Sequence, residues 1–574
     1  MSHIKEIPFG VSNFLDIAKD SLYYVDKTMY LPSLEAAGRF LFMIRPRRFG
    51  KSIFLTMMKD YYDINMADRF SEEFAGTWIA DHPTPLQGKF QVLYLDFSLV
   101  SSSGGDTIKE QFYNYFDNCI DMFFREYKAY YDKDFIAKTL SVGGQGPKLE
   151  NLAREARAKG YMLYLIVDEY DNFTNTILSR GNKESYTSIT QRDGFYREAF
   201  KAFKPNFHRI IMMGVSPITL FDLTSGYNIA TNLSFEAGFN QMLGFSEDDV
   251  REMIRYYREA GQISMDEDEI MDQMRPWYDN YCFSRQSFGK EPGMYNSNMV
   301  LYYLSKLTRT KLPPESMVDP NSRSDYDKLR SLVEIDRKHP ESNRVILEAA
   351  TRGFIEAPLA EQLSVEDMAK EHFLPSMLTY QGALTIGGTI GKNTRLVVPN
   401  LNAREQFYDF MVDIFRDVIP PDDETKRGLE RDAATKGNWT ELISFVMDAY
   451  AEDSTKRLEK DGERLIHGYL LGVFRYSSSF DVSIEVDANT GYCDMLFLPA
   501  LLDGEMHSCV LEIKYLRDRD SEASANEIWE RGVSQVNEYA SSPKIQKATA
   551  GTVVHKLVLM ARVTKVERLE EISS

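Results

Sequence analysis

Several features are scarce or absent in this sequence of 574 residues, and each absence excludes a class of protein. No apolar run approaches the ~20 residues of a membrane-spanning helix, so we expect no membrane protein. The first residues, MSHIKEIPFGVSNF, contain no signal-peptide core. The four cysteines are scattered and form no Cys-x-x-Cys pair, which argues against a structural zinc site and fits the reducing cytoplasm.

Positive charge is also in short supply. The chain has 67 Lys and Arg against 86 Asp and Glu, a net charge of −19. This balance argues against a general nucleic-acid coat, but a local basic groove stays open because the local field governs binding. Hydrophobic residues make up 43% of the chain, so at about 150 residues per domain we expect three or four globular domains.

A candidate phosphate-binding loop occurs in the stretch RFLFMIRPRRFGKSIFLTMMKDYYD, residues 39–63. Gly50-Lys51-Ser52 matches the end of the pattern G-x-x-x-x-G-K-[ST], but Arg45 stands where the pattern has its first glycine. The apolar run before the loop predicts a strand, and the apolar spacing after it predicts a helix. The loop therefore lies where backbone N–H groups at a helix start can bind phosphate. A bare Gly-Lys-Ser also fits an ordinary basic surface turn.

Later apolar runs predict buried strands: QVLYLDFS (91–98), YMLYLIVDEYDNF (161–173) and HRIIMMGVSPIT (208–219), the last ending at Ser216. Unbroken apolar runs are typical of strands covered on both faces of a parallel sheet. Predicted helices alternate with these strands, one of them at 151–160, which indicates a doubly wound α/β domain. Ligands of such domains bind at the carboxyl ends of the strands.

Four polar residues fall at these strand ends, namely Lys51, Asp168, Glu169 and Ser216. Lys51 would reach the β- and γ-phosphates, Ser52 and Asp168 would bind Mg²⁺, and Glu169 would polarise the attacking water, with Asp171 as the next candidate. Ser216 would sense the γ-phosphate. The full set of expected nucleotide contacts is Arg47, Arg48, Phe49, Gly50, Lys51, Ser52 and Ser216. A chance Gly-Lys-Ser would not bring these partners in order, so the sequence favours a nucleotide site.

The middle of the chain has a different texture. An acidic first turn after Ser246 predicts a helix over 244–261. Residues 373–412 read as helix, strand, glycine-rich turn, strand and helix, which indicates a winged-helix-like module. Such modules contact DNA in some ATPases and only pack on the nucleotide domain in others. The expected division is a P-loop domain (1–245), a helical extension (246–345), a winged-helix-like region (346–425) and a C-terminal α/β domain (426–574).

A second constellation lies near the C-terminus. Glu463 falls on a predicted amphipathic helix, and 491–516 predict a hairpin with Asp503-Gly504 at its turn. A three-residue loop at 502–504 would pair residue 501 with residue 505 and, counting back, Asp494 with Glu512. A two-residue turn would put these two carboxylates on opposite faces. Lys514 leaves the same face as Glu512 because the two are two positions apart.

Adjacent carboxylates attract a hard cation such as Mg²⁺, and a neighbouring lysine can stabilise charge on a phosphodiester. This is the arrangement of D…E-x-K nucleases. The alternative is an ordinary hairpin with a polar wet face, because Glu-x-Lys triplets are common.

The first half of the chain resembles the bacterial AAA-ATPase-like family, whose phosphate loop reads RPRRFGKS and also lacks the first glycine. The segments that match in order are YYVDKT, LIVDEYD, GVSPIT, LGFSEDDV, WYDNYCF, MYNSNMVLYYL, LTYQGALTI and VPNLNAREQF. The C-terminus resembles the PD-(D/E)XK nuclease-like domain that ends these chains, through ERLIHGYLLG, GYCDMLF, LEIKYL and GVSQVNEYA. Together the resemblances cover nearly the whole chain.

The resemblance implies nuclease roles for Glu463, Asp494, Glu512 and Lys514, with Asp494 and Glu512 as metal ligands and Gln535 as a helical accessory. Two positions depart from the family. Tyr492 replaces an arginine in G-R-x-D, which would weaken phosphate binding, and Asn280 replaces a glycine in W-Y-x-G-Y-x-F, where asparagine tolerates the same left-handed turn.

The sequence therefore predicts a cytoplasmic, ATP-binding, Mg²⁺-dependent ATPase coupled to a DNA nuclease-like domain, compatible with defence against foreign DNA or with mobile-element biology. The rival hypothesis is a non-nucleolytic ATP switch whose C-terminal domain only binds nucleic acid or a partner protein. ATP is the expected partner and a membrane is not, while DNA contact and self-association into a homo-oligomer remain open.

Overall fold

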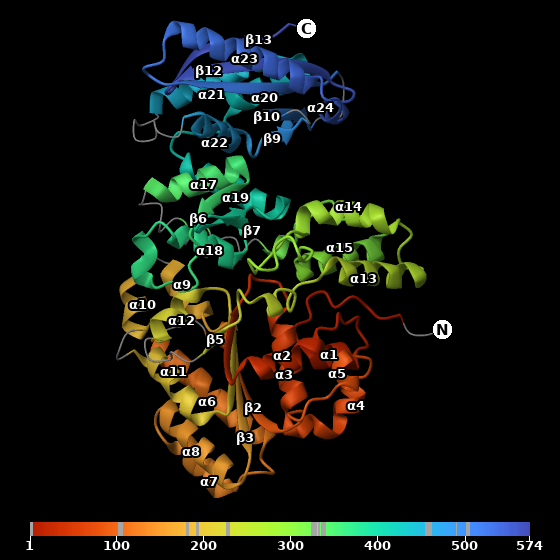
Figure 1. The fold of residues 1–574 in the computed structure, drawn as a ribbon, viewed down its shortest axis with the longest axis vertical. Coiled ribbons are helices and arrows are strands. Elements are labelled where there is room, and N and C mark those ends of the chain that lie inside the picture. Colours follow the sequence, from red (N-terminus) through yellow and green to blue (C-terminus); the bar gives the residue numbers. More distant parts are fainter. Residues whose placement is uncertain are drawn as a thin grey trace. The chain divides into compact units, whose positions relative to one another are not determined.

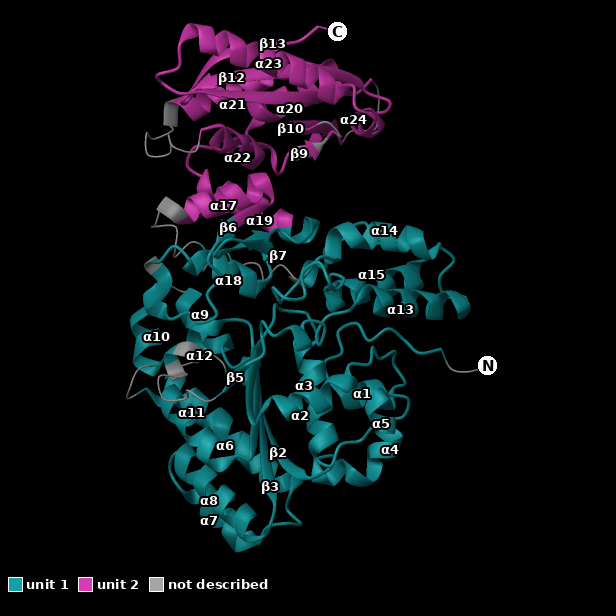
Figure 2. Cartoon of the chain, in the orientation of Figure 1, with its two compact units in different colours: residues 1–338, 356–403 teal, residues 339–355, 404–574 magenta. Residues whose placement is uncertain are grey.

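The computed structural model describes residues 4–100, 107–179, 183–190, 194–224, 230–322, 330, 333, 340–453, 462–488, 491–500 and 505–573. The chain forms two compact units, one of residues 1–338 and 356–403 and one of residues 339–355 and 404–574 (Figures 1 and 2). The expected winged-helix-like segment, 346–425, contributes to both units. The finer division into four domains stays a prediction.

Unit 1 is built on a five-stranded parallel sheet in the order β2-β3-β4-β1-β5. Its strands are β1 (Phe40–Ile44), β2 (Phe90–Asp96), β3 (Met162–Asp168), β4 (Arg209–Gly214) and β5 (Thr231–Asn232). The expected doubly wound α/β fold is therefore present. Because β1 lies inside the sheet beside β4, the loop that follows β1 sits in the interior of the carboxyl edge.

Alternating strand residues feed two separate hydrophobic cores. Leu93 and Leu165 belong to one core, and their neighbours Val92 and Ile166 belong to the other. Figure 1 shows helices on both sides of the sheet. The first core is covered by α6 (Ile108–Glu126), α7 (Lys133–Ser141), α8 (Gln145–Ala158), α9 (Asn172–Ser179), α10 (Lys183–Thr190), α11 (Phe195–Asn206) and α12 (Pro217–Thr224). The second is covered by α1 (Phe14–Lys19), α2 (Leu31–Ala37), α3 (Lys51–Tyr62), α4 (Phe70–Glu73) and α5 (Trp78–Asp81).

Two element boundaries differ from expectation. Strand β4 ends at Gly214 rather than Ser216, because Pro217 opens α12 and proline suits the first turn of a helix. Helix α8 begins at Gln145 rather than 151, because its Pro147 also lies in the first turn, where the missing N–H is tolerated.

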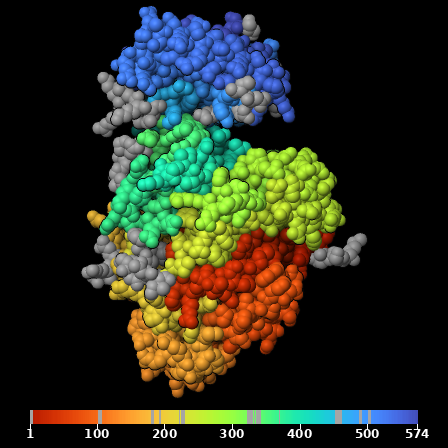
Figure 3. Space-filling model, viewed as in Figure 1, coloured from red at the N-terminus to blue at the C-terminus, as the bar shows by residue number. Residues whose placement is uncertain are grey.

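A helical layer follows the sheet along the chain. It consists of α13 (Glu247–Glu259), α14 (Glu267–Tyr278) and α15 (Ser297–Thr310), and Ser246 caps α13 as expected, in a capping box with Asp249. These helices share a core that includes Val250, and Phe9 from the N-terminal segment packs against it. In the space-filling view the yellow-green residues of this layer lie against the red N-terminal residues (Figure 3). The N-terminal segment is thereby held beside the phosphate loop.

A small three-stranded sheet has the order β6-β8-β7, from β6 (Phe354–Ala357), β7 (Thr385–Ile390) and β8 (Asn393–Val397). Helix α18 (Phe373–Gln381) precedes the β7–β8 hairpin and α19 (Leu401–Ile414) follows it. Strands β7 and β8 and α18 belong to unit 1, whereas the first half of β6 and most of α19 are assigned to unit 2. The expected order of helix, strand, turn, strand and helix is present, and the winged-helix interpretation stays a prediction.

Unit 2 contains a mixed five-stranded sheet in the order β13-β12-β11-β10-β9, in which only the β11–β12 pair is parallel. Its strands are β9 (Phe480–Asp487), β10 (Tyr492–Pro499), β11 (His507–Leu516), β12 (Val553–Arg562) and β13 (Lys565–Glu571). Its described helices are α17 (Pro340–Arg352), most of α19, α20 (Glu424–Lys436), α21 (Trp439–Asp453), α22 (Glu463–Phe474), α23 (Glu522–Ala540) and α24 (Pro543–Ala548).

Helix α23 packs on one face of this sheet through Trp529 and Val536, which meet Val510 and Val558 of the central strands. Within the described part of the chain, no helix is long and apolar enough to cross a membrane.

Candidate functional sites

The phosphate loop joins β1 to α3, and α3 begins at Lys51. Gly50 caps the helix with φ +84°, a left-handed conformation that side-chain-bearing residues rarely adopt. Arg48 is also left-handed, with φ +68°. The loop thus leads into a helix start, where unpaired backbone N–H groups favour a bound anion.

Arg45 replaces the first glycine of the pattern by a side-chain anchor. The residue is 1% exposed, and its guanidinium donates hydrogen bonds to the carbonyl oxygens of Ile44 (3.0 Å), Ser234 (2.6 Å) and Phe239 (2.9 Å). It also lies 4.2 Å over the ring of Phe283. Burial lowers the pKa of Arg45 to about 9, above neutrality. A conformation that a glycine would permit is here fixed by tertiary contacts.

Lys51 is almost fully buried, and its ammonium donates to the carbonyl oxygens of Arg45 (3.1 Å) and Pro46 (2.9 Å). Burial lowers its pKa, and the nearby charges of Glu169 and Asp168 act in the opposite direction. The ammonium is therefore held inside the loop and close to the acidic end of β3.

Asp168 and Glu169 stand at the carboxyl end of β3, as expected. Asp168 accepts hydrogen bonds from the Tyr94 hydroxyl (3.2 Å) and the Glu169 N–H (2.9 Å). Burial raises its pKa, while a hydrogen bond with Ser52 acts to lower it. Burial also raises the pKa of Glu169, against the charge of Lys51. Glu169 has φ +47°, a conformation that is strained for a side-chain-bearing residue and recurs at functional sites.

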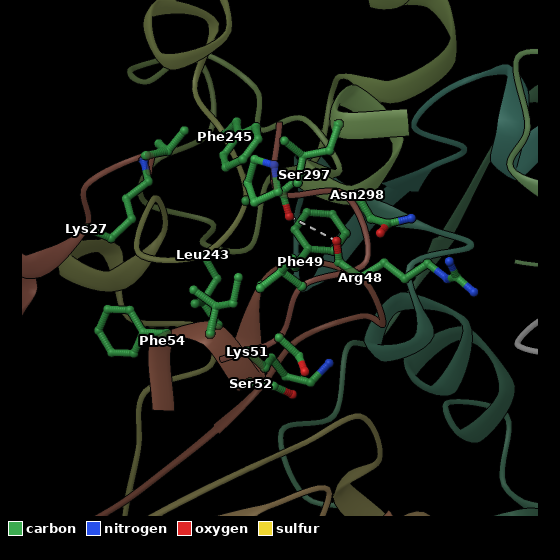
Figure 4. Close-up of a pocket in the computed structure, with 18 of the residues that line it drawn as sticks. Lys27, Arg48, Phe49, Lys51, Ser52, Phe54, Leu243, Phe245, Ser297 and Asn298 are labelled. Carbon is green, nitrogen blue, oxygen red and sulfur yellow. Dashed lines mark hydrogen bonds between the residues drawn. The ribbon is translucent and has the colours of Figure 1, made fainter. Parts of the chain in front are cut away.

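A cavity of about 510 Å³ opens beside the loop, a volume typical of small-ligand sites. One part of its wall is polar and contains Lys51, Ser52 and Glu169. Figure 4 shows Lys51 and Ser52 apart from Leu243 and Phe245, which also line the cavity. The remaining apolar lining residues include Pro8, Val11, Val25, Phe54, Met253 and Leu301, from the N-terminal segment, α3 and the helical layer. A ligand with an anionic end and a flat apolar end fits this division.

Not all expected nucleotide contacts reach the cavity in the same way. Arg48 points away from Lys51 (Figure 4) and forms an ion pair with Asp319 (3.1 Å), while its carbonyl accepts a hydrogen bond from the Ser297 hydroxyl (3.0 Å). Phe49 is buried against the rings of Tyr281 and Phe283. These two residues therefore fasten the loop to its surroundings. They also line the cavity, together with Arg47, Gly50, Lys51 and Ser52.

Ser216 and Asp171 lie behind the loop. Ser216 is fully buried, its N–H donates to Asp171 (2.6 Å), and it does not belong to the lining residues of the cavity. Asp171 also accepts from Asn175 (2.6 Å) and from the N–H of Val215. These contacts tie β3 to β4 and leave Asp171 poorly placed as an alternative base.

The second site is set by the pairing of β10 with β11. Met495 pairs with Leu511 and Phe497 with Cys509, which is the predicted register, and one step further along it sets Asp494 across from Glu512. The strands stop at Pro499 and resume at His507, so Glu505 is not in a strand, and the expected turn residues 502–504 lie outside the described residues. The register prediction is confirmed, and the turn type stays a prediction.

Each carboxylate of this pair has one anchored oxygen. The Ile513 N–H donates to Oδ2 of Asp494 (2.7 Å), and the Lys514 ammonium donates to Oε1 of Glu512 (2.6 Å). Glu512 is 2% exposed, and its Oε2 is buried without a hydrogen bond from any residue that the structure describes. A buried carboxylate oxygen without a donor is a place for a cation.

Helix α22 adds two residues. Glu463 begins the helix and His467 follows one turn later, so both lie on one face. One ligand atom from each of Glu463, His467 and Asp494 lies within 4.8 Å of the others, and His467 Nε2 is 3.7 Å from Asp494 Oδ1. Sequence reasoning assigned Glu463 and missed His467. The available signal was the spacing Glu-x-x-x-His, which is common in helices without a site.

Burial and neighbouring charges shift the pKa values of the three carboxyl groups in this cluster. Burial raises the pKa of Glu512 to about 7, helped by Asp494 and opposed by Lys514. Burial also raises the pKa of Glu463. Burial acts in the same direction on Asp494, but His467 and Lys514 outweigh it and lower the Asp494 pKa. Neighbouring carboxylates whose pKa values are shifted in opposite directions are typical of functional sites.

Helix α23 closes the second site. The Gln535 amide nitrogen donates to the Tyr539 hydroxyl (3.2 Å), and Gln535 Oε1 is buried without a donor among the described residues. A Cβ at Gly491 would lie 2.6 Å from that hydroxyl, so the position before β10 requires glycine. Tyr492, which replaces the expected arginine, is 62% exposed at the start of β10.

Two family models match this chain, one for each of the two candidate sites. Residues 8–224 match the family described as predicted AAA-ATPase, and residues 461–571 match the PD-(D/E)XK nuclease superfamily. The chain joins an AAA-ATPase-like domain to a PD-(D/E)XK nuclease-superfamily domain. The AAA-ATPase-like domain supplies Lys51, Ser52 and Glu169 of the cavity, and later residues such as Phe245 and Leu301 complete its wall. The nuclease-superfamily domain contains the Glu463, Asp494 and Glu512 cluster.

Comparison with individual proteins adds little about activity. Over 314 compared positions the identity to the uncharacterized protein in vnfD 5'region of Azotobacter chroococcum mcd 1 is 26%, and the match covers 49% of this chain and 50% of that protein. The chain thus spans about half the length of this curated relative. The chain is also similar to the solved structure of the Aeropyrum pernix ORC2 protein (ADPNP-ADP complexes), at 10% sequence identity. The match covers 66% of this chain and 90% of the ORC2 chain, and its TM-score of 0.31 is too low to carry an argument.

The structure shows how Asn280, which departs from the family pattern, is accommodated. Asn280 has φ +77°, so asparagine adopts the left-handed turn as expected, and its amide nitrogen donates to the Pro399 carbonyl (3.0 Å). Unit 1 therefore keeps this turn without a glycine.

Proposed function

We propose that the chain binds and hydrolyses ATP in its AAA-ATPase-like domain and that nucleotide state regulates a metal-dependent DNA nuclease in its second domain. The observation that carries the proposal is the clustering of the largely buried side chains of Glu463, Asp494, Glu512 and Lys514. The same chain holds a cavity lined by Lys51, Ser52 and Glu169.

In the ATP site, the N–H groups at the start of α3 and the Lys51 ammonium would hold the phosphates, and the apolar lining would hold the base. Ser52 and Asp168 are the residues that would hold Mg²⁺, which neutralises phosphate charge when bound. Glu169 would take the proton of the attacking water. A pKa raised by burial makes this carboxylate a stronger base than an exposed one.

In the nuclease site, Asp494 and Glu512 are positioned as metal ligands by their anchored oxygens. A bound divalent ion supplies Lewis-acid charge and a more acidic water. Lys514 would stabilise the charge that develops on the phosphodiester. Helix α23 packs closely on Lys514, because a Cβ at Gly532 of this helix would lie only 3.1 Å from the Lys514 side chain. The hydrogen-bonded Gln535 and Tyr539 of the same helix would therefore help to orient the residues around Lys514.

The test uses the full chain with supercoiled and linear DNA, with and without ATP and divalent metal. We expect cleavage that Glu512→Gln abolishes and that Glu538→Gln, on the exposed side of α23, leaves unchanged. Lys51→Ala should abolish tight ATP binding. Glu169→Gln should bind ATP without hydrolysing it, because an amide can hold water but cannot act as a base.

Two results would redirect the proposal. ATP turnover without DNA cleavage under any metal condition would favour the non-nucleolytic switch, for which exposed Tyr492 in place of an arginine is the specific support. Normal ATP binding by Lys51→Ala would contradict the nucleotide site itself.

A further inference from the structure

The nuclease pocket has donors of two chemical kinds. Asp494 and Glu512 supply oxygen, as the sequence indicated, while His467 on α22 supplies imidazole nitrogen. We propose that Glu463, His467 and Asp494 form the primary metal-binding triad of this domain and that the triad selects a divalent transition-metal ion, for which Mn²⁺ is the probe, over Mg²⁺. The inference rests on the proposed nuclease function and departs from the magnesium expected for this site.

The geometry suits a single ion. The three ligand atoms lie within 4.8 Å of one another. Three equally spaced atoms bound to one small divalent ion at about 2.1 Å lie at most about 3.6 Å apart. His467 Nε2 and Asp494 Oδ1 are already near this separation at 3.7 Å. The carboxylate of Glu463 therefore has to approach by on the order of 1 Å, which rotation of this side chain, at the very start of α22, can supply.

The orientation of Asp494 favours the same assignment. Its Oδ2 is occupied by the Ile513 N–H, which leaves Oδ1 on the side of His467, 3.7 Å from Nε2. His467 is 4% exposed, so its imidazole faces the pocket interior rather than solvent. Three donors from two elements, α22 and β10, thus converge without any change of register.

A second, independent observation points to a ligand here. Oε2 of Glu512 is buried, and no described residue donates to it. With Oε1 held by Lys514, this oxygen is the next available donor around the triad. A buried carboxylate oxygen is costly unless a donor or cation satisfies it.

Ligand chemistry decides the ion. Sites made only of carboxylate, carbonyl and water suit both Mg²⁺ and Mn²⁺, whereas imidazole suits transition metals such as Fe, Ni, Cu and Zn. Mn²⁺ binds most weakly in the first-row divalent series, so it is the most demanding probe of a preference over Mg²⁺. Mg²⁺ also gives up its waters reluctantly. One nitrogen donor in a buried set of three therefore shifts the preference away from Mg²⁺.

The first experiment measures Mn²⁺ binding to the full chain by the loss of the free-ion EPR signal, without nucleotide and in an Asp168→Asn background that disables the ATP-site metal position. We expect Mg²⁺ to compete only at concentrations at least about tenfold higher than Mn²⁺. His467→Gln should weaken Mn²⁺ binding at least about tenfold. His467→Asp should retain binding but lose the preference for Mn²⁺. His555→Gln, a histidine of the same unit outside the pocket, should match the parent.

The second experiment reads the ligand directly. Bound Mn²⁺ should show a ¹⁴N coupling from imidazole in pulsed EPR, and His467→Gln should remove it while thermal unfolding confirms that the variant is folded. Unchanged Mn²⁺ affinity in folded His467→Gln, or a wild-type site without ¹⁴N coupling, would overturn the inference.

The two proposals fail in distinguishable ways. Mn²⁺ binding with ¹⁴N coupling but no cleavage of any DNA would contradict the nuclease and leave the triad standing. Cleavage that runs equally well in Mg²⁺ and survives His467→Gln would contradict the triad and leave the nuclease standing.

Discussion

Arg45 stands where phosphate-binding loops usually have a glycine, and three carbonyl oxygens and one aromatic ring surround its guanidinium. A glycine at this point would supply backbone freedom. Arginine supplies the opposite, a fixed conformation enforced by residues far along the chain. At the residue scale the loop is therefore defined by anchoring rather than by flexibility.

Restoring the usual glycine should damage the domain. Arg45→Gly leaves the carbonyls of Ser234 and Phe239 buried without their donor, at a cost of about 3 kcal/mol or more. We expect the first thermal transition to fall by about 5–10 °C and ATP affinity to fall with it. Arg39→Gly, an exposed position just before the same strand, is the control. Unchanged melting together with tighter ATP binding would show that the anchor is dispensable.

A second residue predicts a pH dependence. Asp60 of α3 is 4% exposed, and burial raises its pKa to about 7. An unfolded aspartate titrates near 3.9, so the folded state binds this proton more tightly. The resulting stabilisation is complete below about pH 4 and is lost as the pH rises toward 7.

Asp60→Asn cannot titrate, so the melting temperature of the wild type relative to this variant should fall between pH 5 and pH 7.5. Differential scanning fluorimetry at the two values measures the change, with exposed Asp81→Asn as the control. A difference that stays constant with pH would mean that the folded carboxyl is already ionised at pH 5.

Site residues could be read from the sequence where local rules fix them. The spacing of Glu512 and Lys514 gives a shared face, and counting across the hairpin gave the observed register with Asp494. His467 could not be found this way, because its role depends on how α22 packs against β10. Nor could Arg48 be separated from Lys51, since the difference lies in a partner, Asp319, that is distant in sequence.

At the scale of elements, capping decided several boundaries correctly. Ser246 accepts from the Asp249 N–H and the Asp249 side chain accepts from the Ser246 N–H, so the predicted start of α13 is confirmed. Asp249 also pairs with Lys27, a residue that lines the ATP cavity. Errors arose where a proline opened a helix, at Pro147 and Pro217, because the same residue also reads as a breaker.

Removing this cap should loosen one wall of the cavity. Ser246→Ala leaves a helix-start N–H without its acceptor and costs about 1 kcal/mol, which corresponds to a fall of about 2–4 °C in the melting temperature. Ser264→Ala, in an exposed loop between α13 and α14, should leave the melting temperature unchanged. Equal melting of the two variants would indicate that water replaces the hydroxyl without cost.

At the scale of the whole molecule, the sequence predicted both fold classes because alternation of strands and helices needs only local patterns. It could not predict that residues 339–355 belong with 404–574, since that grouping depends on tertiary packing. Leu347 of α17 illustrates the packing. A Cβ at Gly468 of α22 would lie only 2.6 Å from its side chain, so α17 packs directly against the helix that carries Glu463 and His467.

A fragment that starts at residue 404 retains the five strands of the second sheet but loses α17. We expect it to melt at a lower temperature than a fragment starting at 339, with faster amide hydrogen exchange in α22, because low local burial permits local opening. Circular dichroism and hydrogen-exchange mass spectrometry compare the two fragments. Equal rates of amide hydrogen exchange in α22 of the two fragments would show that α17 does not stabilise α22.

The hydrogen bonds of Arg45 also have a consequence for folding during synthesis. Its partners Ser234 and Phe239 lie 189 and 194 positions further along the chain, and Phe283 is made later still. A nascent chain emerges from the ribosome N-terminus first, so it carries the phosphate-loop sequence long before the residues that shape that loop exist. The phosphate loop therefore cannot reach its final conformation early in synthesis, although it is among the first segments to be made, and under the proposed function a nucleotide could not assist the early folding of this domain.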